Sequence, residues 1–80
     1  MSVYDLKAGE SAKIVAIDIT GSGAARLQSL GITVGKKVTV LAFSLFKTGV
    51  LIGCGAVRVG VRRELAKLIK VSTADSGALL

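Results

Sequence analysis

Residues Arg26–Phe43, which read RLQSLGITVGKKVTVLAF, decide the fold class of the chain. Leu27 and Leu30 are three residues apart and therefore share one face of a helical turn. Gly31 follows at the position where a helix often ends in a left-handed residue, a conformation that glycine adopts without a Cβ clash. The first half of this stretch is therefore expected to be the end of a short helix.

The second half of the stretch has the period of a β-strand. Gly35 marks another turn, and Val38 and Val40 then alternate with polar residues. The apolar period thus changes from about 3.6 to 2 within a few residues. This change predicts a helix that passes through two glycine turns into a strand at 37–43.

The remaining apolar runs predict four further short strands. The run AKIVAIDI at 12–19 alternates imperfectly, so its strand is either covered on both faces or bulged. Leu6 is expected to pin the N-terminus against the sheet. We expect strands at 12–19, 37–43, 50–52, 57–62 and 69–71, a helix at 23–30 with Ser22 as its N-cap, a tight hairpin turn at 53–55, a one-turn helix at 63–68 and a loose tail at 72–80.

The composition supports one small aliphatic core. Of 80 residues, 51% are hydrophobic, yet the chain has only two Phe, one Tyr and no Trp, so Val, Ile, Leu and Ala must fill the interior. Five short strands in so small a chain favour a mainly β fold that is a closed or partly open barrel. A barrel removes the strand edges that an open sheet would expose.

Residue types that perform chemistry are scarce. Histidine is absent, and the single cysteine, Cys54, has no partner for a disulfide and is interpreted as an inert turn residue. A ferrous ion would need several carboxylate or imidazole ligands, whereas the five acids are dispersed along the chain. We therefore predict that the chain is not an enzyme and has no catalytic residue, no metal site and no cofactor.

The N-terminal stretch MSVYDLKAGE carries two acids and no long apolar run, so we do not expect it to be a signal peptide. No window reaches the roughly 18 to 20 consecutive apolar residues of a membrane span. We expect a soluble, cytoplasmic protein without direct membrane insertion.

The net charge of +6 raises the possibility of an anionic partner. The basic residues are scattered, and the densest pairs are Lys36-Lys37 and Arg62-Arg63. Scattered charge is typical of a solvated surface, and no aromatic residue is interleaved with the basic strand at 57–62. A small basic barrel that binds nucleic acid is therefore kept only as the alternative function.

In order and spacing, the chain resembles the ferrous iron transport protein A (FeoA) family over about residues 3–71. Gly60 and Val61 depart from the family's Ala-Leu pair, and the loop FSLFKTG is more apolar than usual in the family. The positions that carry the resemblance are Leu6, Gly9, Ile14, Arg26, Leu27, Leu30, Gly31, Gly35, Val38, Val40, Arg62, Ala66, Ile69 and Val71.

The resemblance implies an SH3-like barrel, which we place at 1–71, and the small, polar, aperiodic stretch at 72–80 is expected to follow it as a flexible tail. It also implies a cytoplasmic accessory or regulatory protein that contacts a FeoB-like membrane transporter of ferrous iron, which has a GTPase domain. Despite the iron in the family's name, we predict no metal site. A homo-oligomer is a further possible assembly.

Two surfaces are candidate partner-binding sites. The loop residues Phe43, Leu45, Phe46 and Lys47 bring both phenylalanines together, either as an exposed contact or with Phe43 and Phe46 capping the barrel ends. The second surface is basic, and its alternative is ordinary solvated charge. It consists of Arg58, Arg62 and Arg63, with Arg26 as a further member.

Overall fold

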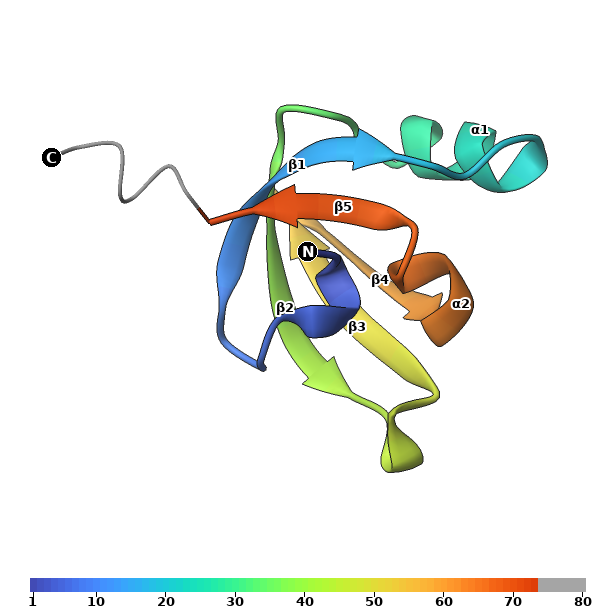
Figure 1. Ribbon diagram of the computed structural model, residues 1–80. Coiled ribbons are helices and arrows are strands. Elements are labelled where there is room, and N and C mark those ends of the chain that lie inside the picture. Colours follow the sequence, from blue (N-terminus) through green and yellow to red (C-terminus); the bar gives the residue numbers. More distant parts are fainter. Residues whose placement is uncertain (74–80) are drawn as a thin grey trace, which may run out of the picture.

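The computed structural model describes residues 1–73, and Figure 1 shows the arrangement of their elements. Within this part of the chain, five strands form one sheet, joined by two small helices and two 3-10 turns. In chain order the elements are η1 (Val3–Asp5), β1 (Ser11–Ile17), α1 (Ser22–Ser29), β2 (Lys37–Phe43), η2 (Leu45–Lys47), β3 (Gly49–Cys54), β4 (Val57–Arg62), α2 (Arg63–Ala66) and β5 (Ile69–Ser72).

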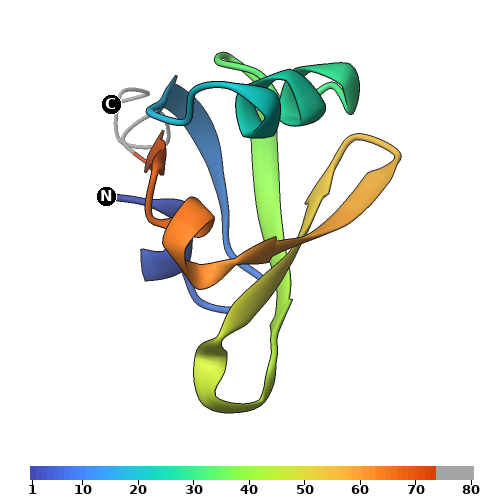
Figure 2. The same ribbon diagram turned by 90° about the vertical axis from the view of Figure 1, so that its right-hand side faces the viewer.

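The sheet curls into a partly open barrel (Figures 1 and 2). Its strand order is β4-β3-β2-β1-β5, with all neighbours antiparallel, so β4 and β5 are its two edges. The short helix α2 joins these edges, and η1 packs against α2 and β5. The predicted mainly β fold is confirmed, with a helix between the first two strands and a one-turn helix before the last.

The predicted helix end is a complete Schellman motif. The Ile32 N–H donates to the Leu27 carbonyl at 2.9 Å, and the Gly31 N–H donates to the Gln28 carbonyl at 3.0 Å. Gly31 has a φ of 84°, the left-handed conformation expected for it. Leu27 and Ile32 are both buried in the core, so the cap is sealed by an apolar contact as well as by hydrogen bonds.

The second glycine turn ties the connection between α1 and β2 to β1. Gly35 has a φ of 94°, and its N–H donates to the Ile14 carbonyl at 2.8 Å. The Ile14 N–H in turn donates to the Lys36 carbonyl, also at 2.8 Å. These two bonds continue the β1–β2 ladder beyond its last pair, Lys13 with Lys37, so β2 begins in register with β1.

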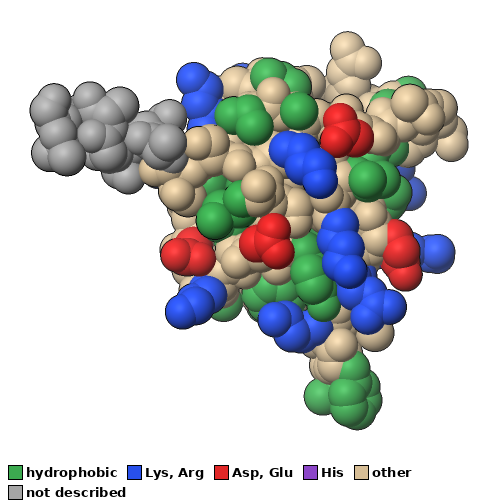
Figure 3. All heavy atoms as spheres, in the orientation of Figure 1, with side chains coloured by type: hydrophobic (Ala, Val, Ile, Leu, Met, Phe, Trp, Pro, Cys, Tyr) green, Lys and Arg blue, Asp and Glu red, His purple; other side chains and the backbone are tan. Residues whose placement is uncertain are grey.

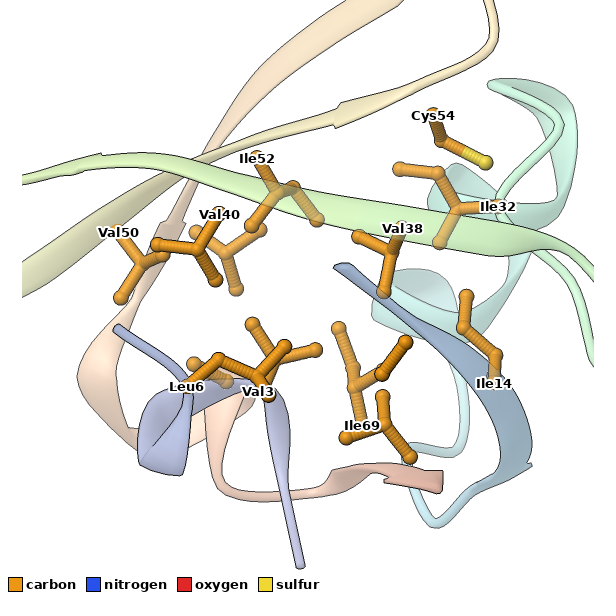
Figure 4. Close-up of a cluster of buried hydrophobic side chains, with 14 of the residues drawn as sticks. Val3, Leu6, Ile14, Ile32, Val38, Val40, Val50, Ile52, Cys54 and Ile69 are labelled. Carbon is orange, nitrogen blue, oxygen red and sulfur yellow. The ribbon is translucent and has the colours of Figure 1, made fainter. Parts of the chain in front are cut away.

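The core is aliphatic, as the composition predicts. Figure 4 shows its side chains converging from β1, β2, β3, β5 and the N-terminal segment. Leu6 is buried, which confirms that it pins the N-terminus to the barrel. Burying one such side chain stabilises a fold by about 1.5–3 kcal/mol. The largest fully buried residues are Ile14, Ile32, Ile52, Ile69, Val3, Val38 and Val40.

Two β-bulges bend the sheet into its barrel shape. The β1–β5 register shifts at Val15, and the β2–β3 register shifts at Leu41. A bulge bends its strand and increases the local twist, while the extra side chain turns outward. Val15 and Leu41 are accordingly exposed. Of the two alternatives for the imperfect strand at 12–19, the bulge is the one that the structure contains.

Two local predictions are wrong. Ser22 is the first residue of α1 rather than its cap, because Gly21, at a φ of 72°, occupies the N-cap and no side chain bonds to the helix start. The hairpin turn is Gly55–Ala56 rather than 53–55, and Gly53 and Cys54 continue β3. A two-residue turn needs only one glycine with positive φ, here Gly55 at 63°, so its two predecessors pair with β4.

Most of the other element boundaries differ from prediction by one or two residues. The strand predicted at 50–52 is longer and spans Gly49–Cys54, and β5 extends through Ser72, one residue past the predicted boundary of the domain. Most of the tail expected at 72–80 lies outside the described residues.

The acid of η1 holds the N-terminus in place. The Ser2 N–H donates to Asp5 Oδ2 at 2.8 Å, and the Ser2 hydroxyl donates to the same oxygen at 3.1 Å. The backbone hydrogen bond holds the pKa of the Asp5 carboxyl below its ordinary value of 3.8. Because the folded pKa is lowered, this carboxylate stabilises the fold above the unfolded pKa, and the contribution is lost as the pH falls through the folded pKa.

Replacing Gly31 by alanine tests the helix end. The position has open space for a Cβ, so backbone strain at positive φ is the only cost, about 1–2 kcal/mol. Gly60→Ala is the matched control, because Gly60 also has open space but no positive φ. Urea unfolding should show a lower free energy of unfolding for Gly31→Ala alone. Equal free energies of unfolding for the two variants would contradict the left-handed conformation of Gly31 at the helix end.

Replacing Asp5 by asparagine tests the N-terminal anchor. The variant keeps the side-chain shape but loses the charge, so its melting temperature should be lower than that of the natural chain near neutral pH. The difference should shrink as the pH is lowered through the folded pKa of Asp5, since both side chains are then neutral. The measurement is thermal unfolding of both chains, followed by circular dichroism, from neutral pH down through the folded pKa of Asp5. A difference independent of pH would exclude the carboxylate as the cause.

Candidate functional site

The loop between β2 and β3 is closed at its base by four hydrogen bonds. The Ser44 N–H donates to the Gly49 carbonyl at 2.9 Å, and the Gly49 N–H donates to the Ser44 hydroxyl oxygen at 2.8 Å. The Lys47 N–H donates to the Ser44 carbonyl at 2.8 Å, and the Ser44 and Thr48 hydroxyls are 3.0 Å apart. This base holds η2 as a defined turn.

The turn points two large apolar side chains into solvent. Leu45 is 79% exposed and Phe46 is 83% exposed, and we call these two residues the loop tip. In Figure 3 hydrophobic atoms protrude from the lower end of the molecule, where this loop lies in Figure 1. Phe46 and Lys47 also adopt left-handed φ angles of 64° and 57°. Such a conformation is strained in residues other than glycine.

Phe43 and Lys47 belong to the base of the loop rather than to its tip. The Phe43 ring meets the Tyr4 ring edge to face, with centroids 5.9 Å apart. Lys47 Nζ lies 4.7 Å from the centre of the Phe43 ring, and the Tyr4 hydroxyl donates to the Lys47 carbonyl at 2.9 Å. Lys67, which directly follows α2, places its Nζ 5.3 Å from the centre of the Tyr4 ring. Of the two predicted phenylalanine caps, Phe43 therefore packs on the barrel and Phe46 does not.

Tyr4 is the residue of this site that sequence reasoning missed. It lies far from the loop along the chain, and no local pattern links the two. The sequence offers one weak signal, an aromatic residue between the apolar residues Val3 and Leu6. In the structure it contacts the loop from the N-terminal segment, through its hydroxyl and its ring.

The predicted basic surface is divided among three places. Arg58 lines a shallow hollow with Lys37 on the outer face of the sheet. Arg62 and Arg26 line a cleft between β4 and α1. The Arg63 guanidinium lies 3.8 Å from the Glu64 carboxylate, with both side chains exposed. The four arginines therefore form no continuous stripe, and only Arg26 and Arg62 come together in one concave site.

Cys54 is buried in β3 rather than placed in a turn, so that prediction needs correction. Its thiol faces the Gly31 carbonyl at 3.8 Å, beneath the end of α1. Within residues 1–73 no three His, Cys, Asp or Glu side chains are grouped so that they could hold a metal ion. None of the helices in this part of the chain has the length and apolar character that a membrane crossing requires.

The curled sheet of five antiparallel strands with two small helices places the protein among the small SH3-like barrels. The model of the FeoA domain matches residues 1–73. The chain therefore belongs to the FeoA family, which confirms the resemblance found in the sequence.

Solved structures agree with this assignment. The solution structure of the FeoA protein from Chlorobium tepidum is 30% identical, with a TM-score of 0.84 over 89% of this chain and 68% of that chain. The zinc complex of Stenotrophomonas maltophilia FeoA is 26% identical, with a TM-score of 0.78 over 92% of each chain. The latter is described as a prokaryotic SH3 domain protein and a suggested activating factor of bacterial ferrous iron transport.

A manganese-dependent transcriptional repressor shares the fold at 19% identity, with a TM-score of 0.77 over 89% of this chain and 39% of that chain. No curated protein matches the sequence significantly.

Removing the Tyr4 hydroxyl tests the link between the N-terminus and the loop. Tyr4→Phe keeps the ring contact with Phe43 but loses the hydrogen bond to the Lys47 carbonyl, which should destabilise the chain by about 0.5–1.5 kcal/mol. Hydrogen exchange of the Lys47 and Gly49 amides should become faster, while exchange in β1 changes little. Unchanged exchange in the loop would show that the phenol does not order it.

Proposed function

We propose that this protein is a small cytoplasmic accessory of ferrous iron transport that regulates the membrane transporter by contact with its GTPase-containing cytoplasmic domain. Membership of the FeoA family and the suggested role of the Stenotrophomonas maltophilia relative support the link to iron transport. The contact is the finer part of the proposal. The observation that carries it is the loop tip, held outward by its own base.

Two energetic terms oppose the conformation of the tip. Leu45 and Phe46 leave apolar surface in water, and Phe46 adopts a left-handed backbone. The hydrogen-bonded base and the Tyr4 contact hold this arrangement in the free protein. A rigid apolar tip loses little conformational entropy when it enters a pocket, and aromatic anchors of this kind often dominate binding energy.

A regulatory role by contact also agrees with the scarcity of chemical groups. Residues 1–73 contain no cluster of metal-binding side chains, so zinc binding is not carried over from the relative. The only thiol is buried. Iron therefore enters this proposal as the cargo of the transporter and not as a ligand of this chain.

The nucleic-acid alternative has less support. Its binding would need a continuous positive groove with exposed aromatic rings for stacking, whereas the arginines are divided among separate places. The Tyr4 and Phe43 rings are already covered by each other and by Lys47, which leaves Phe46 as a single exposed ring on a loop that carries none of these arginines.

Replacing Phe46 by aspartate tests the tip. Binding of the purified chain to the transporter's soluble GTPase domain, measured with and without guanine nucleotide, should weaken at least about tenfold, since the anchor is replaced by a charge. Val34→Asp is the matched control, because Val34 is also exposed, at 59%, but lies outside the loop. It should bind like the natural chain.

Phe46→Gly separates binding from stability. Glycine relieves the left-handed strain, so the melting temperature should stay the same or rise while binding to the GTPase domain falls. Unimpaired binding by folded Phe46→Asp and Phe46→Gly variants would exclude the tip as the contact. Loss of self-association instead, seen by analytical ultracentrifugation, would assign the tip to a second copy of the chain.

A further inference from the structure

The strand β4 is an edge of the sheet, and its outer side faces a cleft. β4 pairs with β3 along its whole length and has no strand on its other side in the part of the chain that the structure describes. Figure 2 shows α1 above β4, with α2 continuing from the end of β4. An uncovered strand edge presents hydrogen-bonding groups that can pair with another extended chain.

The register of the β3–β4 hairpin identifies which backbone groups are directed outward. Its two-residue turn makes Cys54 and Val57 a hydrogen-bonded pair, so Val59 and Val61 also bond to β3. The intervening residues then direct their N–H groups away from β3. These residues are Arg58, Gly60 and Arg62, and Gly60 has no side chain to obstruct an approaching chain.

The cleft beside this edge has a volume of about 380 Å³ and is enclosed by three elements. α1 contributes Leu27 and Leu30, and α2 contributes Leu65. β4 contributes Val59 and Gly60, among others. If a second chain lay along β4, one face of that chain would contact these apolar side chains.

Two arginines line the same cleft, and neither has an ion-pair partner in the described part of the chain. Arg26 comes from α1 and Arg62 from the end of β4, and both residues line the cleft. Neither forms an ion pair within residues 1–73, in contrast to Arg63. Arginine binds carboxylates through two parallel hydrogen bonds, and its stem packs on apolar surface. The charge of the cleft therefore matches an acidic occupant.

We propose that the cleft between α1 and the outer edge of β4 binds an extended acidic segment of a partner protein, which pairs with β4 as a sixth strand while its carboxylates contact Arg26 and Arg62. Backbone pairing with alternate side chains in pockets is a known mode of peptide recognition. This surface is distinct from the loop tip, so the inference goes beyond the proposed function and does not depend on it.

The probe is the synthetic peptide acetyl-VEVEV-amide, in which the period of 2 places both carboxylates on one side. On binding, the amides of Arg58, Gly60 and Arg62 should become protected from hydrogen exchange in nuclear magnetic resonance spectra. The amides of Val59 and Val61 should change little, because they already bond to β3. An alternating pattern of this kind distinguishes strand pairing from loose electrostatic attraction.

Variants separate the two parts of the proposal. The double change Arg26→Gln and Arg62→Gln should weaken peptide binding at least about tenfold, and the uncharged peptide acetyl-VQVQV-amide should bind the natural chain correspondingly weakly. Arg63→Gln is the matched control and should bind within about twofold of the natural chain. Gly60→Pro should also weaken binding, because it removes one outward N–H donor. The variant should still fold, because proline is tolerated on the outer side of an edge strand.

Three results would overturn the proposal. The first is the absence of spectral change on adding acetyl-VEVEV-amide. The second is unchanged affinity in the double arginine variant, which keeps the test valid even if Gly60→Pro fails to fold. The third is protection of the three outward amides that grows with protein concentration without peptide, because the occupant would then be a second copy of the chain.

Discussion

The two hydrogen bonds that join Ile14 to the turn at Gly35 and Lys36 set the relation between α1 and the sheet. They continue the β1–β2 ladder at the place where the chain returns from the helix, and so they define the register of β2. The core depends on that register, because a slip of one residue would turn Val38 and Val40 away from the interior. The position of α1 relative to the sheet, and with it the cleft beside α1, depends on this connection.

Much of the fold can be predicted from the sequence because local signals agree with the final packing. The helix end, the second glycine turn and β2 all lie where the period change places them. The exact position of the hairpin turn cannot be predicted, because the sequence does not say that Gly55 rather than Gly53 adopts a positive φ. Gly53 has a different role: the bulged Leu41 side chain lies against it, and a Cβ there would approach Leu41 Cδ1 to 3.3 Å. A contact between neighbouring strands has no local signature.

The candidate site could be predicted only in part, for a related reason. The apolar loop is visible in the sequence, but whether Phe43 or Phe46 is covered depends on Tyr4, more than thirty-five residues away. The left-handed conformation of Phe46 and Lys47 is equally invisible, since neither residue type favours it. The cleft arises from the outer edge of β4 and the place of α1, and both are properties of the assembled barrel.

The burial of Cys54 has a practical consequence. Its thiol lies under the end of α1 and faces the Gly31 carbonyl. A maleimide or iodoacetamide reagent can therefore reach the thiol only when the end of α1 and β3 separate. The rate of alkylation therefore measures how often this end of the barrel opens. The natural sequence thus carries its own reporter of local opening, at a single position and without any added label.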